Sequence, residues 1–247
     1  MRSALIADLH ANREAVEAVL AHARGQQVDN WVFLGDFVGY GADPGWVVDV
    51  VRAHVQAGAI AVQGNHDQAV VQGVSPNMNA DARRVVDWTR ARLDNSQIAF
   101  LAGLPMTAHR DDQLFVHANA WRPGGWAYVQ GRADALRCFN ATQSCYTFCG
   151  HTHEPRLYNL SATGKVGEFI PIAGVAIPVP SHRQWLAIPG SAGQPRDGNP
   201  AACYAVFDDL SRTLMFHRVP YDHEEAGAKI RAAELPQRLA ARLEDGH

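Results

Sequence analysis

The sequence has no long hydrophobic run and few cysteines. None of its apolar stretches reaches the roughly 18 residues that a membrane-spanning helix needs. The four cysteines form no Cys-x-x-Cys pair, so we expect free thiols. No signal-peptide pattern follows Met1, and cleavage of a leader would remove Asp8, which belongs to a polar motif described below. These absences predict a cytoplasmic protein without a membrane partner.

The sequence also lacks a basic run, and its formal net charge is −3. A protein that binds long nucleic acid needs a surface rich in lysine and arginine, so we expect no such partner. Small anionic substrates remain compatible with this composition, because bound metal ions would dominate the local charge. The length of 247 residues and the hydrophobic fraction of 47% predict one globular domain over residues 1–247.

Strand-like apolar runs alternate with helical patterns in the first 150 residues. We predict strands at 3–7, 30–34, 59–63, 106–109, 114–116 and 146–149, and helices at 13–23, 44–57, 79–93 and 132–139. This alternation indicates a largely parallel sheet with a site at the carboxyl ends of its strands.

The last 100 residues have a different pattern, with short strands joined by turns rich in glycine and proline. We predict strands at 156–160, 168–179, 184–188, 203–207 and 214–219, which indicate an antiparallel part. A helix at 224–244 should break at Pro236. Two sheets packed face to face with helices outside would satisfy the whole pattern.

Four polar stretches and one isolated histidine follow the strand-like runs. They are Asp8-Leu9-His10-Ala11-Asn12, Gly35-Asp36, Gly64-Asn65-His66-Asp67, Gly150-His151-Thr152-His153, and His117. Together they offer nitrogen and oxygen ligands without a thiolate, which suits Mn, Fe, Co, Ni or Zn better than Ca. Taken singly, Asp36 could cap a turn, Asn65 could stabilise a left-handed turn, and His117 could be a core histidine.

This order of motifs resembles the calcineurin-like metallophosphoesterase superfamily, in particular its small prokaryotic branch of phosphodiesterase and diadenosine tetraphosphatase-like proteins. The specific signatures are Asp-x-His-x-Asn and Gly-Asp-Phe-Val-Gly-Tyr-Gly, and the likeness runs from about Asp8 to Arg196. The resemblance implies an α/β (α+β) fold, a four-layer αββα sandwich of two mixed β-sheets flanked by helices. It also implies two divalent metal ions, with Mn as the first choice.

The resemblance implies a role for each residue of the constellation. Asp8, His10 and His153 would bind the first ion, Asn65, His117 and His151 would bind the second, and Asp36 would bridge both. Two such ions lower the pKa of a shared water, and the resulting hydroxide would attack phosphorus. His66 would be the catalytic general acid, or a hydrogen-bond donor to the leaving oxygen. The expected substrates are small phosphate esters or anhydrides of the phosphodiester or nucleotide type.

Departures from related sequences bear on two alternative functions. Eukaryotic-type protein phosphatases continue the second motif with aspartate and arginine, whereas Gly39 and Tyr40 stand here. This disfavours a phosphoprotein phosphatase. A non-catalytic metal-binding scaffold of the same fold is disfavoured because His66 and every expected ligand are present. The stretch 189–197 keeps the branch's Gly-Gln-Pro-Arg-Asp, although Ile188 replaces an expected asparagine.

Three residues are candidates for binding the substrate. Arg196 offers a planar fork that matches phosphate, although it could instead bridge to Asp197 or a turn carbonyl. Asn12 could touch the phosphate, or it could only cap the helix that follows. Tyr40 is the third candidate.

The segment 119–132 follows His117 and contains Trp121, Trp126 and Tyr128. We hypothesise that it stacks a nucleobase, and the alternative is that its aromatic residues pack the loop onto the sheet. The other seven histidines receive no role, and the sequence leaves the oligomeric state open.

Overall fold

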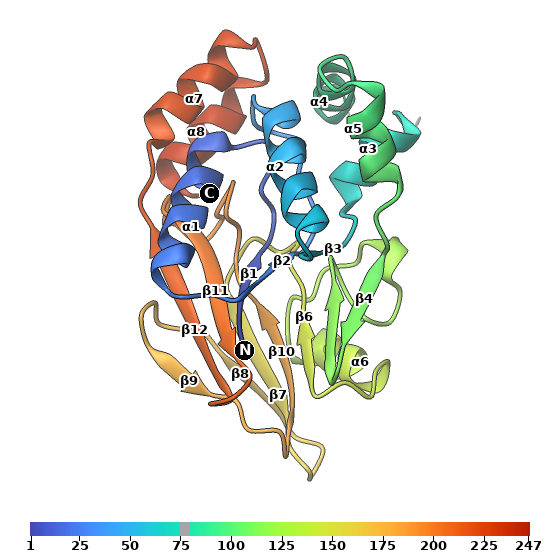
Figure 1. Ribbon diagram of the computed structural model, residues 1–247, viewed down its shortest axis with the longest axis vertical. Coiled ribbons are helices and arrows are strands. Elements are labelled where there is room, and N and C mark those ends of the chain that lie inside the picture. The colour runs from blue at the N-terminus through green and yellow to red at the C-terminus, as the bar shows by residue number, and fades with distance from the viewer. Residues whose placement is uncertain (75–79) are drawn as a thin grey trace.

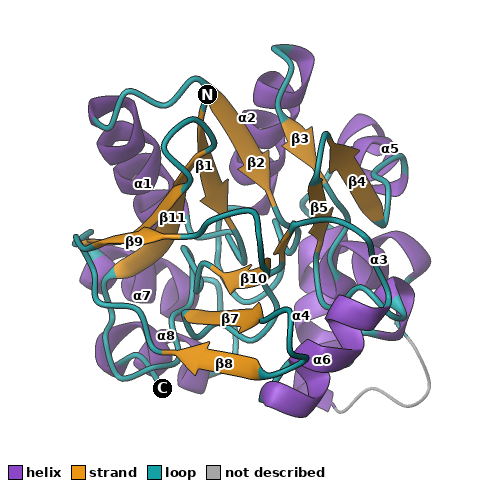
Figure 2. Ribbon diagram, turned by 90° about the horizontal axis from the view of Figure 1, so that it is seen from below, coloured by secondary structure: helices purple, strands orange, loops and turns teal. Residues whose placement is uncertain are grey.

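Two six-stranded sheets lie face to face in the computed structural model, which describes residues 1–74 and 80–247 (Figures 1 and 2). The first sheet has the order β3 (Ile60–Ala61), β2 (Asn30–Phe33), β1 (Arg2–Ile6), β11 (Ala202–Asp208), β12 (Thr213–Val219) and β9 (Ala176–Pro178). Its first three strands are parallel, and the others pair antiparallel.

The second sheet has the order β4 (Thr107–Arg110), β5 (Gln113–Val116), β6 (Tyr146–Phe148), β10 (Gln184–Ile188), β7 (Arg156–Leu160) and β8 (Val166–Phe169). Strand β6 runs parallel to both neighbours, and the remaining pairs are antiparallel. Both sheets are therefore mixed.

Helices form the two outer layers. The described helices are α1 (Arg13–Gly25), α2 (Pro44–Gln56), α3 (Asn65–Gln72), α4 (Ala80–Arg90), α5 (Asn95–Ala102), the 3-10 turn η1 (Pro123–Gly125), α6 (Arg132–Asn140), α7 (His223–Ala232) and α8 (Gln237–Asp245). Helices α1 and α2 contact the first sheet, and α6 contacts β7, β8 and β10 of the second. Figure 2 shows α1 and α2 on one side of the paired sheets and α6 on the other. The predicted four-layer sandwich is confirmed.

Successive side chains of a strand point to opposite faces of its sheet, so each strand contributes to two layers of the core. Ile6 packs between the first sheet and its helices, whereas its neighbour Leu5 packs between the sheets. In the same way Phe115 faces the space between the sheets and Val116 faces the layer around α6. Burial on both faces explains why these strands read as continuous apolar runs rather than alternating ones.

Several sequence predictions need correction. The segment 168–179 is not one strand: β8 and β9 belong to different sheets, and the connection between them contains Pro171 and Gly174, whose φ is +79°. Proline cannot donate to a strand ladder, and the left-handed glycine turns the chain. The strand predicted at 59–63 is also too long, because β3 comprises only Ile60–Ala61.

The helix predictions were more accurate. Helices α3 and α5 were missed, although Asp94 and Gln97 form a capping box at the start of α5. The predicted helix start at Asn79 lies outside the described residues. The predicted break at Pro236 is confirmed, because this residue separates α7 from α8. None of the helices in the described ranges combines the length and the apolar character needed to cross a membrane.

Candidate metal centre

The predicted ligands lie where five neighbouring strands end, and both sheets contribute. Asp8 follows β1, Asp36 follows β2, and Asn65 begins α3 after β3. His117 follows β5, and the turn with His151 and His153 follows β6. Since these strands end at one edge of the sandwich, the chain order of the motifs becomes a spatial cluster.

The backbone at this edge is unusual. Asp8, His10, Asp36, His151 and His153 all have a positive φ, between 47° and 68°. Each non-glycine residue in this region costs about 1–2 kcal/mol and persists only when surrounding contacts enforce it. Here β1 and β2 continue into paired loops, with Asp8 N–H donating to the Gly35 carbonyl at 3.1 Å. The fold stabilises a local geometry that the chain alone would avoid.

One buried group consists of Asp8, His10, Asp36 and His153, whose ligand atoms lie within 4.8 Å of one another. His10 Nε2 and His153 Nε2 are 3.0 Å apart. His153 Nε2 lies 3.6 Å from an Asp8 carboxylate oxygen, and His10 Nε2 lies 3.8 Å from Asp36 Oδ2. We call these four residues the inner group.

A second group shares Asp36 with the inner group and adds His117 and His151, again within 4.8 Å. His117 Nε2 lies 3.4 Å from Asp36 Oδ2, 3.1 Å from Asn65 Oδ1 and 3.2 Å from His151 Nδ1. We call Asp36, Asn65, His117 and His151 the outer group. The two groups have the composition that the resemblance implied.

The hydrogen bonds of the imidazoles indicate which ring nitrogens face the centre with a lone pair. The outward nitrogens of His10, His117 and His153 contact the carbonyl oxygens of Val38, Leu34 and Gln194 at 3.2, 2.7 and 2.6 Å, and His151 Nε2 contacts the Trp126 carbonyl at 2.9 Å. A carbonyl oxygen only accepts, so each outward nitrogen carries the proton. In the inner group, the lone pairs of His10 and His153 then oppose each other, which a cation between them would resolve.

The buried carboxylates give a second reason to place cations here. Asp8 and Asp36 are almost completely buried, and no lysine or arginine pairs with either within the described residues. Burial raises the pKa of Asp8 to about 7. Burial opposes protonation of His117, yet the Asp36 and Asp8 carboxylates raise its pKa to about 9. Burying two carboxylates is costly even with one imidazolium beside them, so these residues fit divalent cations.

The pKa values of the other ligand imidazoles favour the neutral form, which is the form that binds metal. Burial lowers the pKa of His151 to about 4 and holds that of His10 and His153 well below the usual range.

His66 lies beside the groups without joining either. The His66 ring packs edge-to-face with Tyr40 at 4.4 Å and with His10 at 5.1 Å between centroids. The backbone N–H of His66 donates to Asp36 Oδ1 at 2.8 Å. A Cβ on Gly39 would lie 2.5 Å from His66 Nδ1. The glycine that departs from the protein-phosphatase pattern is therefore the residue that leaves room for His66.

Asp67 was named in the third motif but received no role. Its buried carboxylate accepts N–H groups of Asp36 and Gly64 at 2.9 Å each, and of Phe37 and Val38 at 2.9 and 3.3 Å. It thus ties the Asp36 loop to the first turn of α3. The signal that could have found it is its place in the first turn of α3, a helix that was not predicted. A carboxylate there accepts free N–H groups.

Two of the three predicted substrate-binding residues are held within the fold. Asn12 caps α1 by accepting from the Ala15 N–H at 3.2 Å, and its amide donates to the Gly193 carbonyl at 2.8 Å. Arg196 donates to Gln194 Oε1 at 3.0 Å and lies 5.7 Å from the centre of the Tyr40 ring. The alternative that Arg196 forms an ion pair with Asp197 is wrong, since the Asp197 carboxylate pairs with Arg218.

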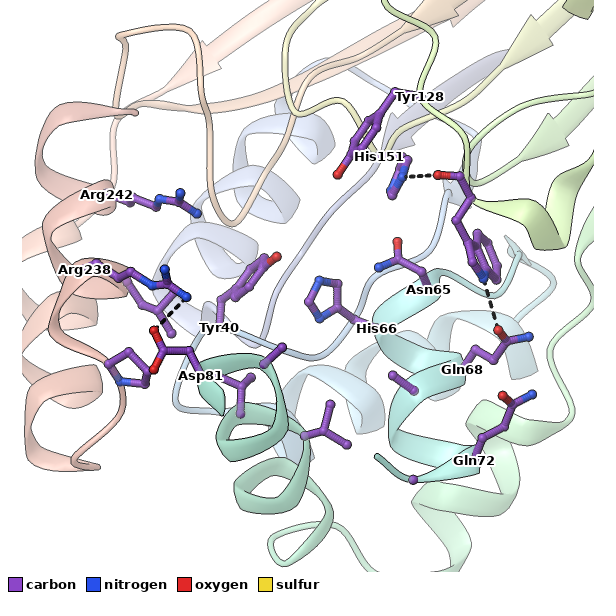
Figure 3. Close-up of a pocket in the computed structure, with 18 residues that line it drawn as sticks. Tyr40, Asn65, His66, Gln68, Gln72, Asp81, Tyr128, His151, Arg238 and Arg242 are labelled. Carbon is purple, nitrogen blue, oxygen red and sulfur yellow. Dashed lines mark hydrogen bonds and ion pairs between the residues drawn. The ribbon is translucent and has the colours of Figure 1, made fainter. Parts of the chain in front are cut away.

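A cavity of about 580 Å³ opens beside the outer group (Figure 3). It is lined by Tyr40, Asn65, His66, Gln68, Trp126, Tyr128, His151 and residues of α4 and α8. This volume lies in the range of roughly 300–1,000 Å³ that ligand pockets occupy. None of the four inner-group residues lines this cavity, so access from the cavity to the centre runs past the outer group.

The aromatic segment after His117 contributes part of this lining. Tyr128 stacks on His151 with ring centroids 4.1 Å apart, and the Trp126 indole donates to Gln68 at 3.1 Å. Trp121 instead packs beneath the Arg137 guanidinium at 4.3 Å. The packing alternative therefore describes Trp121, while Trp126 and Tyr128 border the cavity.

Comparisons with known proteins agree with this arrangement. An uncharacterised protein of Methanocaldococcus jannaschii is 32% identical over 97% of this chain and 96% of its own length. The crystal structure of a metallophosphoesterase from Sphaerobacter thermophilus matches with a TM-score of 0.89 and 36% identity over 100% of this chain and 99% of that chain. A hypothetical protein from Pyrococcus horikoshii shares the fold, with a TM-score of 0.80, 16% identity, and coverage of 100% of this chain and 98% of that chain.

The sequence profile of the calcineurin-like phosphoesterase superfamily domain matches residues 1–211, which include all seven predicted ligands and His66. Membership of this superfamily supports metal-dependent hydrolysis of phosphoesters. The chain belongs to the calcineurin-like phosphoesterase superfamily.

Proposed function

We propose that this protein hydrolyses small phosphate esters or anhydrides with two bound divalent metal ions, of which Mn is the first candidate. The observation that carries the proposal is that two buried ligand groups share one carboxylate, Asp36, and adjoin a ligand-sized cavity. Phosphodiester or nucleotide-type molecules are the substrates that we expect.

The ions, when bound, would activate a water molecule and neutralise charge on the phosphoryl group. The protein contributes a rigid frame for them. The backbone carbonyls of Val38, Leu34 and Gln194 hold the imidazoles in one tautomer, and Asp67 holds the Asp36 loop. Such fixed orientation of ligands is what lets a site act without reorganising during the reaction.

His66 is the residue that we propose as the proton donor to the leaving oxygen. It lines the cavity, while its own backbone N–H is held by Asp36. Burial lowers the pKa of His66, so its ring is neutral before the substrate enters. A phosphate anion beside the ring would raise that pKa again, because a nearby negative charge favours imidazolium.

Trp126 and Tyr128 support a nucleotide-type substrate. Both border the cavity next to His151, on a segment that leads directly from His117. A nucleobase stacked on an aromatic ring gains about 1–3 kcal/mol. Nucleotides should therefore quench tryptophan fluorescence, whereas phenyl phosphate should do so less.

The experiment that tests the proposal compares His66→Ala with wild type and with His182→Ala, a control at an exposed histidine. Each protein is loaded with Mn, its metal content is measured, and it is assayed with bis(p-nitrophenyl) phosphate, p-nitrophenyl phosphate and diadenosine tetraphosphate. We expect His66→Ala to lose about 10²–10⁴-fold in kcat with unchanged metal content. Full activity in this variant would remove His66 from the mechanism.

The same assay, with a phosphopeptide added as a fourth substrate, separates the alternatives. A loaded wild-type protein that turns over none of the three substrates would argue for a scaffold. Turnover of a phosphopeptide above all three would argue for a phosphoprotein phosphatase.

A further inference from the structure

The wall of the cavity that faces the metal-ligand candidates comes from helices α4 and α8. Asp81 and Val85 of α4 line it together with Arg238 and Arg242 of α8. In Figure 3 the two arginines lie across the cavity from Asn65 and His151, with Tyr40 and His66 between. Helix α8 lies beyond residue 211, where the family match ends, so family membership assigns Arg238 and Arg242 no role.

The two arginines of this wall differ in their partners. Arg238 pairs with Asp81 at 2.8 Å, which joins α8 to α4. The Arg242 guanidinium has no ion pair or hydrogen bond within residues 1–74 and 80–247, and its side chain is half-buried. In Figure 3 it extends into the cavity on the same side as Tyr40. Arg242 is thus a cation in a cavity without a counter-ion.

Neighbouring charges make this position more positive still. Burial, with the guanidinium groups of Arg196 and Arg238 nearby, lowers the pKa of Arg242 below its usual range. Arginine nevertheless stays charged in proteins. An anion in the cavity would relieve the repulsion that these neighbours exert on Arg242.

We infer that Arg242 binds a second anionic group of the substrate, a phosphate separate from the one that is hydrolysed. The inference rests on the proposed function only for the first phosphate, which the metal centre would hold. A guanidinium binds phosphate through two parallel N–H groups, so it also orients the molecule. The preferred substrates are then esters or anhydrides that carry two phosphate groups, since a single phosphate at the metal centre would leave Arg242 unpaired.

Binding of non-hydrolysable phosphonates to the metal-loaded protein tests this inference. Free metal is removed by gel filtration, and methylphosphonate is compared by calorimetry with straight-chain alkane bisphosphonates of about two to six carbons, because affinity peaks when the chain matches the distance between two sites. In wild type we expect the best bisphosphonate to bind about tenfold to a hundredfold more tightly than methylphosphonate.

The variants assign this gain to one residue. Arg242→Gln should lose the gain, Arg242→Lys should keep part of it, and Arg238→Gln should keep it, since Arg238 is paired with Asp81. Thermal unfolding of each variant shows that it is folded. The inference is overturned if wild type shows no gain, if the gain survives in Arg242→Gln, or if Arg238→Gln removes it equally.

This measurement does not depend on turnover. A gain that requires Arg242 in a protein that hydrolyses no phosphoester would refute the proposed function and leave the second anion site standing. Turnover without any gain would do the reverse.

Discussion

The inner and outer groups of the centre use the same kinds of residue in different surroundings. Asp8, His10 and His153 are enclosed by the fold, whereas Asn65 and His151 border the cavity. Asp36 is common to both groups. The difference indicates a division of tasks: the inner group is suited to retaining an ion, and the outer group is suited to meeting the substrate.

The shared carboxylate should have the largest effect. Asp36→Ala removes a ligand from both groups, so we expect loss of both ions and a fall in activity of about a thousandfold or more. His153→Ala and His151→Ala should each lose only one ion. Elemental analysis of the purified variants, alongside kcat, checks this order. Retention of two ions in Asp36→Ala would show that the groups are independent.

Exposure of the two groups to a chelator should differ. We expect EDTA to remove one ion quickly and the other slowly, because only the outer group borders the cavity. His153→Ala, which lacks an inner-group ligand, should show the fast phase alone. The measurement is metal content against time of exposure. A single rate for both ions in wild type would contradict the contrast in access.

A substitution at Gly39, which lies against the His66 ring, should have a smaller effect than the loss of a metal ligand. A Cβ at Gly39 collides with the His66 ring, so Gly39→Ala should lower kcat by about tenfold to a hundredfold and leave metal content unchanged. Its φ of +87° adds a stability cost of about 1–2 kcal/mol.

Gly58→Ala is the matched control for this change. Gly58 also has a positive φ, +102°, but a Cβ there meets nothing within 4 Å. Denaturant unfolding should report similar losses of stability for both variants, while kinetics should separate them. Equal activity in the two would mean that His66 tolerates displacement.

The smallest predicted effect concerns a histidine cluster away from the centre. His217 stacks on Tyr204, and its Nε2 is buried without a hydrogen-bond partner among the described residues. Burial, with His22 and Arg2 nearby, lowers the pKa of His217 to about 4 from 6.5. The unfolded chain then binds the extra proton between these pH values. Stability from this group is therefore complete above pH 6.5 and lost as pH falls towards 4.

His217→Phe should remove that dependence. We expect the stability difference between wild type and variant to shift by about 1 kcal/mol from pH 7 to pH 5, allowing for solvent near the ring. Urea unfolding at several pH values measures it. Parallel curves for the two proteins would show that His217 titrates normally in the fold.

Much of the fold and of the site could be predicted because the relevant signals are local. Asp8 and His10 follow an apolar strand, Asn12 precedes an amphipathic helix, and Pro236 breaks one. Such signals depend on residues within a few positions, and chain order then placed the motifs at one edge of the sheets. The segment 168–179 failed because an apolar run does not show which sheet each half will join.

Local patterns in the sequence were enough to predict the residue types of the centre, their order and the layered architecture. Tertiary structure decided the tautomers of the imidazoles, the room that Gly39 leaves for His66, the anchoring by Asp67 and the position of Arg242 across the cavity. The physical reason is that each of these depends on atoms from segments far apart in the chain. Their distances are set by how the two sheets and α8 pack, which no local pattern encodes.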